Sequence, residues 1–212
     1  VKSLYSAGMN WLLQGLNDAQ RAAVETIDGP LLVIAGAGSG KTRVLTSRLA
    51  HILHKRLADP YQILAVTFTN KASGEMRQRV TQILGTEIPE LQVSTFHSFC
   101  ARVLRRDAAA LGYGTNFTIF DDADSQTLVK NCIRELGYSD AQFPARGQMR
   151  KISDAKNRLI GPEDFASGSS GYFESRTAEI YKMYQQRLRD CNAMDFDDLL
   201  CNATRMLRDI SE

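Results

Sequence analysis

The chain has 212 residues, of which 43% are hydrophobic and 24% charged, and this composition fits one large globular domain or two smaller ones. The formal net charge of +2 excludes binding of nucleic acid through overall charge, so any such surface must be a local basic patch. The four cysteines form no C-x-x-C pair, and no apolar run is long enough to span a membrane. We therefore expect reduced thiols, no zinc site, no membrane partner and a cytoplasmic location. Residues 1–8 differ in character from the rest of the chain, and Met9 would be a natural start, so the fold prediction leaves residues 1–8 out.

The first predicted element in chain order is a short amphipathic helix that begins after Asn17. Asn17 is placed as the N-cap, and Gln20 stands three residues later, which is the spacing of a capping box. Gln20 has a second interpretation, because its side chain carries one donor and one acceptor, which fits the N6/N7 edge of adenine. From this residue alone, the helix cap is the favoured interpretation.

A strand that leads into a phosphate-binding loop is predicted next. Residues 31–35 are apolar and predict a strand buried on both faces, and a glycine-rich turn comes directly after them. The pattern A-x-x-G-x-G-K-T ends in Lys41 and Thr42 and predicts a P-loop, with a helix starting at about Gly40. In such a loop the helix N-terminus faces the β-phosphate, Lys41 reaches the β/γ-phosphates and the Thr42 hydroxyl holds Mg²⁺. Lys41 and Thr42 are therefore the predicted catalytic residues, and Thr42 is the predicted metal ligand.

Residues 63–69 predict a second buried strand, and the strand–helix–strand order indicates a right-handed crossover and a parallel sheet. A helix opens at Asn70. Because ligands gather at the carboxyl ends of parallel strands, residues 67–71 are expected on the same edge as the P-loop. Phe68 lies at this strand exit and is interpreted either as a core residue or as a ring that stacks on a base.

Residues 91–96 predict a third strand, and the helix after it carries several arginines. The hydroxyls at the end of this strand and the ring of His97 are suited to contact phosphate oxygens, and the arginines favour a nucleic-acid backbone over a small substrate. The alternative is a capped helix with a solvated basic face.

The sequence changes character at Ala108, after which strand-like runs vanish and helical patterns dominate. Helices are predicted over 124–136, 148–159 and 177–191, with a flexible loop over 167–171. These patterns predict an α/β fold, with a P-loop and a parallel sheet, and a second, mostly helical unit. Five basic residues recur in one stretch and form either a duplex-facing patch or a solvated helix face; they are Arg146, Arg150, Lys151, Lys156 and Arg158.

A strand that ends in an acidic residue for Mg²⁺ completes most P-loop ATPases. Residues 117–122 have the outline of such a strand, but the residues after them resemble a helix start. Residues 195–198 are acidic, but no apolar strand precedes them, and they begin an amphipathic helix. Neither segment fits the pattern of a strand that ends in an acidic residue for Mg²⁺. The residues needed for ATP hydrolysis beyond the P-loop are therefore not identified in this sequence.

Five segments together resemble motifs of the UvrD/PcrA/Rep-like superfamily 1 DNA helicases, in their amino-terminal part. They are residues 16–24 (the Q motif), 35–42 (Walker A), 66–72 (motif Ia), 94–99 (motif Ib) and 194–200 (the segment before Walker B). The resemblance makes Gln20 the adenine reader, and it implies that Phe68 shapes a base pocket. The implied nucleotide-binding residues are Gln20, Ala35, Gly36, Ala37, Gly38, Ser39, Gly40, Lys41, Thr42 and Arg43. The implied DNA-binding residues are Thr67, Phe68, Thr69, Asn70, Thr95 and His97.

The same resemblance implies how the chain is organised and what it does. The implied fold is α/β, a P-loop (RecA-like) parallel sheet that is incomplete, with an inserted, mostly helical subdomain. Residues 9–107 are expected to form part of the first RecA-like domain, residues 108–190 a helical insert that touches duplex DNA, and residues 191–212 a return helix that stops before Walker B. The implied function is that of the ATP- and single-strand-binding amino-terminal fragment of an ATP-dependent, 3′-to-5′ DNA helicase of repair or replication. Its partners would be single-stranded DNA and single/double-strand junctions, and no particular protein partner is implied. The 212 residues alone are expected to be inactive in hydrolysis.

Two other functions fit the same residues. One is a non-catalytic, nucleotide-gated DNA-binding module that natively ends at Glu212. The other is a recombination-type helicase–nuclease subunit, which the short helical insert disfavours.

Overall fold

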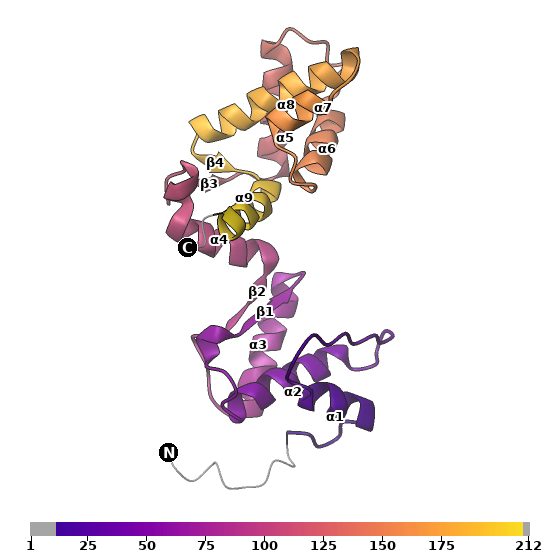
Figure 1. Ribbon diagram of the computed structural model, residues 1–212, viewed down its shortest axis with the longest axis vertical. Coiled ribbons are helices and arrows are strands. Elements are labelled where there is room, and N and C mark those ends of the chain that lie inside the picture. Colours follow the sequence, from indigo (N-terminus) through magenta and orange to yellow (C-terminus); the bar gives the residue numbers. More distant parts are fainter. Residues whose placement is uncertain (1–11, 210–212) are drawn as a thin grey trace. The chain divides into compact units, whose positions relative to one another are not determined.

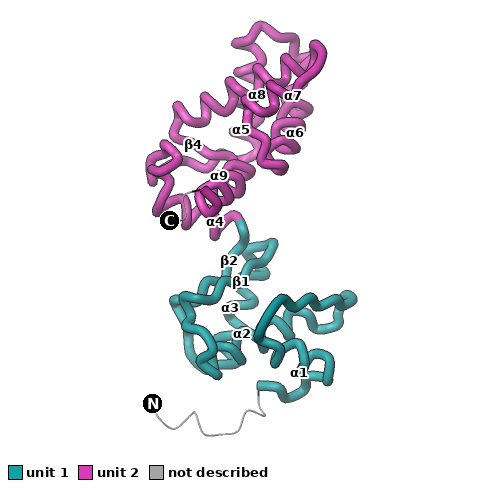
Figure 2. The backbone as a smooth tube through the Cα atoms, in the orientation of Figure 1, with its two compact units in different colours: residues 1–96 teal, residues 97–212 magenta. Residues whose placement is uncertain are grey.

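The computed structural model describes residues 12–209, which divide into two compact units. Unit 1 is Val1–Phe96 and unit 2 is His97–Glu212 (Figure 2). The expectations for residues 1–8 and Met9 lie outside the described residues. The predicted start of the helical insert at residue 108 falls inside unit 2 and stays a prediction.

Unit 1 contains a parallel pair of strands with helices before and between them (Figure 1). Helix α3 is the crossover between the two strands, and α2 packs against both α1 and α3. The parallel pairing predicted from the strand–helix–strand order is thereby confirmed. The elements are α1 (Asp18–Glu25), α2 (Lys41–His54), the 3-10 helix η1 (Pro60–Gln62), β1 (Leu64–Thr67), α3 (Asn70–Leu84) and β2 (Gln92–Thr95).

Two clusters of apolar side chains form the core of unit 1. One joins α1 to the first turn of α2, and the other joins α2, α3 and β2. The first consists of Leu13, Leu16, Ala23, Val24 and Val44, and the second of Leu49, Met76, Val80, Leu91 and Val93. Strand β1 is less covered than predicted, since Leu64 is 47% exposed.

The prediction of a buried strand over residues 31–35 is wrong for this structure. The segment forms no strand, because within residues 12–209 the sheet of unit 1 consists of β1 and β2 alone and offers it no partner. The exposed fractions alternate along it: 40% for Leu31, 82% for Leu32, 44% for Val33 and 89% for Ile34. This period of two is that of a strand with one covered face. The covered side faces a pocket of about 330 Å³ that α1 and α2 help to line.

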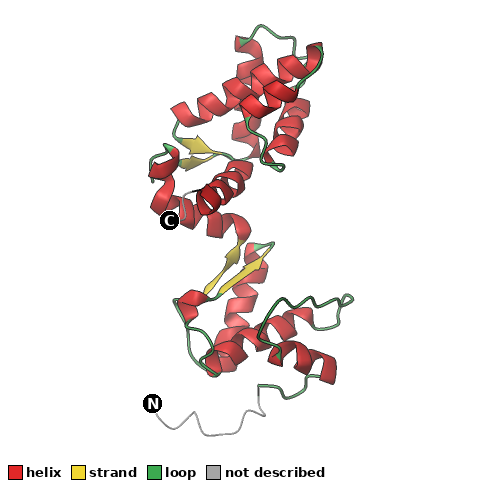
Figure 3. Ribbon diagram, viewed as in Figure 1, coloured by secondary structure: helices red, strands yellow, loops and turns green. Residues whose placement is uncertain are grey.

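Unit 2 consists mainly of helices, with one short parallel strand pair (Figure 3). The pair contradicts the prediction that strands vanish after residue 108, and β4 directly precedes Asp195, where no strand was expected. Strands of two residues are too short to leave an apolar run in the sequence. The elements are α4 (Phe96–Asp107, whose first residue belongs to unit 1), the 3-10 helix η2 (Ala108–Leu111), β3 (Thr118–Ile119), α5 (Asp122–Glu135), α6 (Ala145–Lys156), α7 (Pro162–Gly168), α8 (Tyr172–Asp190), β4 (Ala193–Met194) and α9 (Phe196–Asp209).

The predicted helices of unit 2 are present, and their N-termini lie two to five residues earlier than the periodicity indicated. Helix α5 starts early because Asp121 caps it, accepting hydrogen bonds from the backbone N–H groups of Ala123 and Asp124. Helix α7 was not predicted, although Gly161 before Pro162 is a typical start. Within residues 12–209, no helix is both long and apolar enough to cross a membrane.

Two separate cores stabilise unit 2. The larger lies among α5, α6 and α8, and the smaller lies among α4, η2, β4 and α9. The larger consists of Val129, Cys132, Ile133, Phe143, Ile152, Ala155, Ile180, Tyr181, Tyr184, Leu188 and Ala193. The smaller consists of Cys100, Leu104, Ala108, Tyr113, Phe117, Met194, Leu199, Ala203 and Met206.

Candidate functional site

A glycine turn leads from the exposed apolar segment into α2 in unit 1. Gly38 and Gly40 have φ values of 73° and 84°, a left-handed conformation that favours glycine. The backbone N–H and the hydroxyl of Ser39 both donate to the carbonyl oxygen of Gly36, at 3.4 and 2.7 Å, and so close the turn. Helix α2 then begins at Lys41, as predicted, and no side chain caps it. Its first N–H groups are therefore available to an anion.

Lys41 lies over this turn. Its Nζ donates to the carbonyl oxygens of Ala35 and Gly36, at 2.9 and 2.6 Å. An anion in the turn would compete with two neutral carbonyl groups for the ammonium, and a phosphate is the stronger acceptor because it is charged. Thr42 is the next residue, on the first turn of α2, and is exposed. Arg43 is held elsewhere, since its Nη2 donates to the carbonyl oxygen of Gln14 at 3.1 Å.

Gln20 combines the predicted cap with a contact to the turn. Its backbone N–H donates to Asn17 Oδ1 at 2.9 Å, and its Oε1 accepts from the Asn17 N–H at 3.1 Å, so the capping box is confirmed. Its Nε2 also donates to the carbonyl oxygen of Ser39 at 3.0 Å. A Cβ at Gly40 would lie 3.0 Å from this Nε2, so a side chain there would crowd Gln20. The amide therefore lies against the turn while both of its ends are engaged.

A second group of predicted residues lies where β1 and β2 end. The strands pair in register, with Thr67 opposite Thr95. The Thr67 hydroxyl is engaged locally, 2.5 Å from Ser73 Oγ, and Thr69 caps α3 by accepting from the Ala72 N–H at 3.1 Å. Thr95 is buried, with 8% of its surface exposed.

Phe68 is the most exposed large apolar residue of this edge, with 93% of its surface accessible. The interpretation of Phe68 as a core residue is therefore wrong. The ring of Phe96 lies beside it, with the two centroids 6.2 Å apart. Asn70 is exposed at the start of α3. The predicted common edge with the P-loop required residues 31–35 to join this sheet, and they do not.

His97 belongs to unit 2 and lies at the start of α4. It is exposed, and its ring meets the ring of Phe196 edge-on, with centroids 5.7 Å apart and planes at 90°. Phe196 is the first residue of α9 and is 44% exposed. The contact thus joins the first turn of α4 to the first turn of α9.

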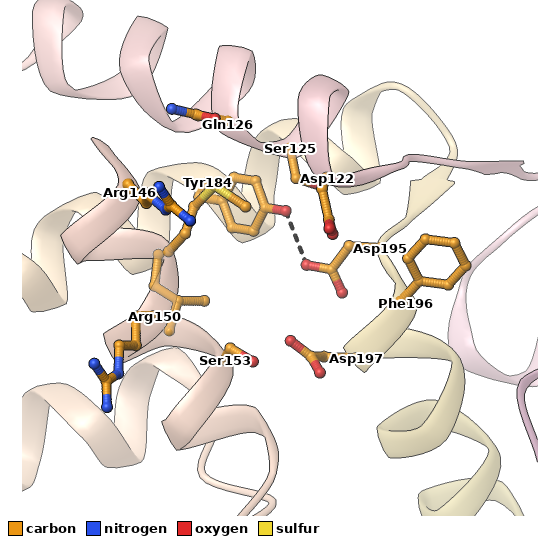
Figure 4. A pocket seen from close by; sticks show the side chains of 12 residues that line it. Asp122, Ser125, Gln126, Arg146, Arg150, Ser153, Tyr184, Asp195, Phe196 and Asp197 are labelled. Carbon is orange, nitrogen blue, oxygen red and sulfur yellow. Dashed lines mark hydrogen bonds between the residues drawn. The ribbon is translucent and has the colours of Figure 1, made fainter. Parts of the chain in front are cut away.

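A pocket of about 360 Å³ lies beside this contact in unit 2. Figure 4 shows Arg146 and Arg150 of α6 on one side of it, and Asp122, Asp195 and Asp197 on the other. The two arginines are one helical turn apart and have no acidic partner within residues 12–209. They are therefore available to bind an anion. Burial raises the pKa of the Asp197 carboxyl group.

Lys156 forms a buried ionic cluster with two aspartates of the return segment. Its Nζ lies 2.7 Å from Asp195 Oδ2 and 2.8 Å from Asp198 Oδ1, and the exposed fractions of the three side chains are 3%, 9% and 5%. The predictions that placed Lys156 on a duplex-facing patch or a solvated face are both wrong. Burial opposes the charge on this lysine, but the carboxylates of Asp198 and Asp195 outweigh it and raise the pKa.

Two side chains of α8 complete the cluster. The Tyr184 hydroxyl donates to Asp195 Oδ2 at 2.8 Å, which is the dashed contact in Figure 4. Gln185 Nε2 donates to both oxygens of Asp198, at 3.2 and 3.1 Å. The cluster therefore ties α6 and α8 to the first turn of α9.

Comparisons with known proteins place these features in a family. The profile of the UvrD/REP helicase N-terminal domain matches residues 16–212. Three relatives are proteins named ATP-dependent DNA helicase PcrA: the one from Bacillus subtilis is 44% identical over 203 residues, that from Leuconostoc citreum 45% over 190 residues, and that from Staphylococcus aureus 42% over 204 residues. The alignments cover 96%, 89% and 96% of this chain, but only 28%, 25% and 28% of the relatives.

Proposed function

The chain belongs to the UvrD/REP helicase N-terminal domain family, and we propose that it is the part of an ATP-dependent DNA helicase that binds ATP and single-stranded DNA. The observation that carries the proposal is the glycine turn of unit 1, where the ammonium of Lys41 lies over the turn that leads into the uncapped start of α2. The 3′-to-5′ polarity, a role in DNA repair or replication and a cytoplasmic location belong to the same proposal. The relatives are named as ATP-dependent DNA helicases, and this chain spans about a quarter of their length. The full helicase activity is therefore part of the proposal.

ATP would bind with its phosphates in the turn formed by residues 36–40. The N–H groups at the start of α2 would bind phosphate oxygens, and Lys41 would leave the carbonyl groups of Ala35 and Gly36 to pair with the β/γ-phosphates. The Thr42 hydroxyl would hold Mg²⁺, which screens the phosphate charge and fixes the orientation of the phosphates when it is bound. The uncapped helix start and the exposed threonine fit both groups.

Gln20→Ala is expected to weaken the binding of ATP more than that of GTP, because only adenine carries the N6 donor and N7 acceptor that a glutamine amide matches. The amide would leave the Ser39 carbonyl to reach the base. Binding of both nucleotides to the 212-residue chain would be measured by titration calorimetry. Asn17→Ala is the matched control, since it breaks the same capping box but keeps the Gln20 amide. Equal losses for ATP and GTP would leave Gln20 with the capping role alone.

Single-stranded DNA would bind at the carboxyl ends of β1 and β2. The exposed ring of Phe68 offers a stacking surface for a base, and Asn70 is accessible to the DNA backbone. His97 would contact phosphate, with its ring orientation fixed by Phe196. Arg146 and Arg150 would supply phosphate contacts to the duplex side of a single/double-strand junction.

Phe68→Ala is expected to weaken single-strand binding by about 1–3 kcal/mol, because a base loses its stacking partner. The salt dependence of binding should not change, since no phosphate contact is removed. Fluorescence anisotropy with a labelled oligonucleotide at several salt concentrations measures both quantities. Tyr61→Ala serves as the control, because Tyr61 is another exposed aromatic residue of unit 1, 67% accessible and outside the strand ends. An unchanged affinity of the Phe68 variant would refute the stacking role.

A further inference from the structure

Phe96 occupies the same position after β2 that Phe68 occupies after β1. The parallel register pairs Thr67 with Thr95, the last residues of the two strands, and the residue that follows is a phenylalanine in both cases. The two ring centroids are 6.2 Å apart with planes at 52°, and both rings are accessible, Phe68 to 93% and Phe96 to 45%. The strand ends therefore present two adjacent aromatic rings to solvent.

A ring that is half exposed at this point contributes little to the core of unit 1. Neither apolar cluster of that unit includes Phe96, and its ring contact is with a side chain that is itself almost fully accessible. Ring centroids 4.5–7 Å apart are in the range of favourable aromatic pairs, but the tilt leaves part of each face open. Open aromatic faces side by side are suited to flat, apolar partners, and consecutive bases of a single strand are such partners.

We propose that Phe96 is a second base-stacking residue, which together with Phe68 forms a two-ring platform for adjacent bases of a single strand. The proposal rests on the proposed function, since the strand ends must bind single-stranded DNA for the platform to act. The two rings directly follow neighbouring strands, so the paired strand ends hold them side by side. Because every base has a flat face, the platform would bind different base sequences with similar strength.

The experiment compares two single strands of equal length and charge. One is oligo(dT), and the other is the same strand with its central nucleotides made abasic, which keeps the phosphates and removes the rings. The 212-residue chain and its variants Phe96→Leu and Phe96→Trp would be titrated with both. Phe96→Leu is expected to weaken oligo(dT) binding at least about five-fold, leave abasic-strand binding unchanged and leave the thermal unfolding midpoint of the chain unchanged. Phe96→Trp is expected to restore oligo(dT) affinity.

Phe68→Leu tests single-strand binding at the strand ends separately from the stacking role of Phe96. If it weakens oligo(dT) binding and Phe96→Leu does not, the second ring has no stacking role, and the proposed function stands. Equal losses of Phe96→Leu on the two strands would also overturn the stacking role. If the unsubstituted chain binds neither strand, both the proposed function and the platform fail.

Discussion

Lys156→Met is expected to lower the free energy of unfolding by about 3–5 kcal/mol, the usual cost of leaving buried charge without its partner. The substitution keeps the length of the side chain but removes the ammonium that lies 2.7 and 2.8 Å from Asp195 and Asp198. The two carboxylates would remain buried beside each other with no cation in contact. Urea denaturation monitored by circular dichroism measures the loss.

Two further variants make the interpretation specific. Lys151→Met changes an exposed lysine of the same helix, and its expected cost is below about 0.5 kcal/mol. The triple variant Lys156→Met, Asp195→Asn, Asp198→Asn removes every charge of the cluster and is expected to recover most of the loss, because neutral amides are much easier to bury than carboxylates. A triple variant as unstable as Lys156→Met would show that packing, and not unpaired charge, dominates the cost.

Lys41→Ala is expected to weaken ATP binding by about 1.5–3 kcal/mol, which is a ten-fold to more than hundred-fold loss of affinity. The glycine turn would keep its N–H groups, but the phosphates would lose the ammonium of Lys41 that lies against it. Titration with Mg·ATP measures the effect.

Lys55→Ala is the matched control, since Lys55 is an exposed lysine at the opposite end of α2. It should bind ATP as the unsubstituted chain does, and the unfolding midpoints of all three proteins should agree, because Lys41 is exposed and outside the apolar clusters. Undiminished affinity of the Lys41 variant would rule out the P-loop role of the turn.

The features that local sequence signals determine were predicted well. Asn17 and Gln20 stand at the spacing of a capping box, and the structure forms that box. The glycines before Lys41 predicted the turn and the helix start, since only a few residue types adopt left-handed conformations easily. The parallel pairing of β1 with β2 was predicted from the order of strand and helix.

The features that depend on partners distant in the sequence were not predicted. Residues 31–35 have the composition of a buried strand, but a strand also needs a hydrogen-bonded neighbour, which composition does not report. Lys156 belongs to a basic stretch, and nothing near it in sequence indicates that its partners lie 39 and more residues away. Phe68 carried two interpretations because hydrophobicity alone does not distinguish a core ring from an exposed stacking ring.

The short strands of unit 2 have a consequence for how this region can change in length. Ile119 of β3 pairs with Met194 of β4 in parallel, and parallel neighbours need only a dozen or so residues of crossover between them. The crossover here is far longer and carries α5 to α8, which form most of the larger core, while the smaller core uses β4 and residues before β3 and after β4. The segment between the two strands can therefore change in length over evolutionary time without disturbing the smaller core, provided that it starts and ends at this pair and that α6 and α8 still bring Lys156, Tyr184 and Gln185 to Asp195 and Asp198.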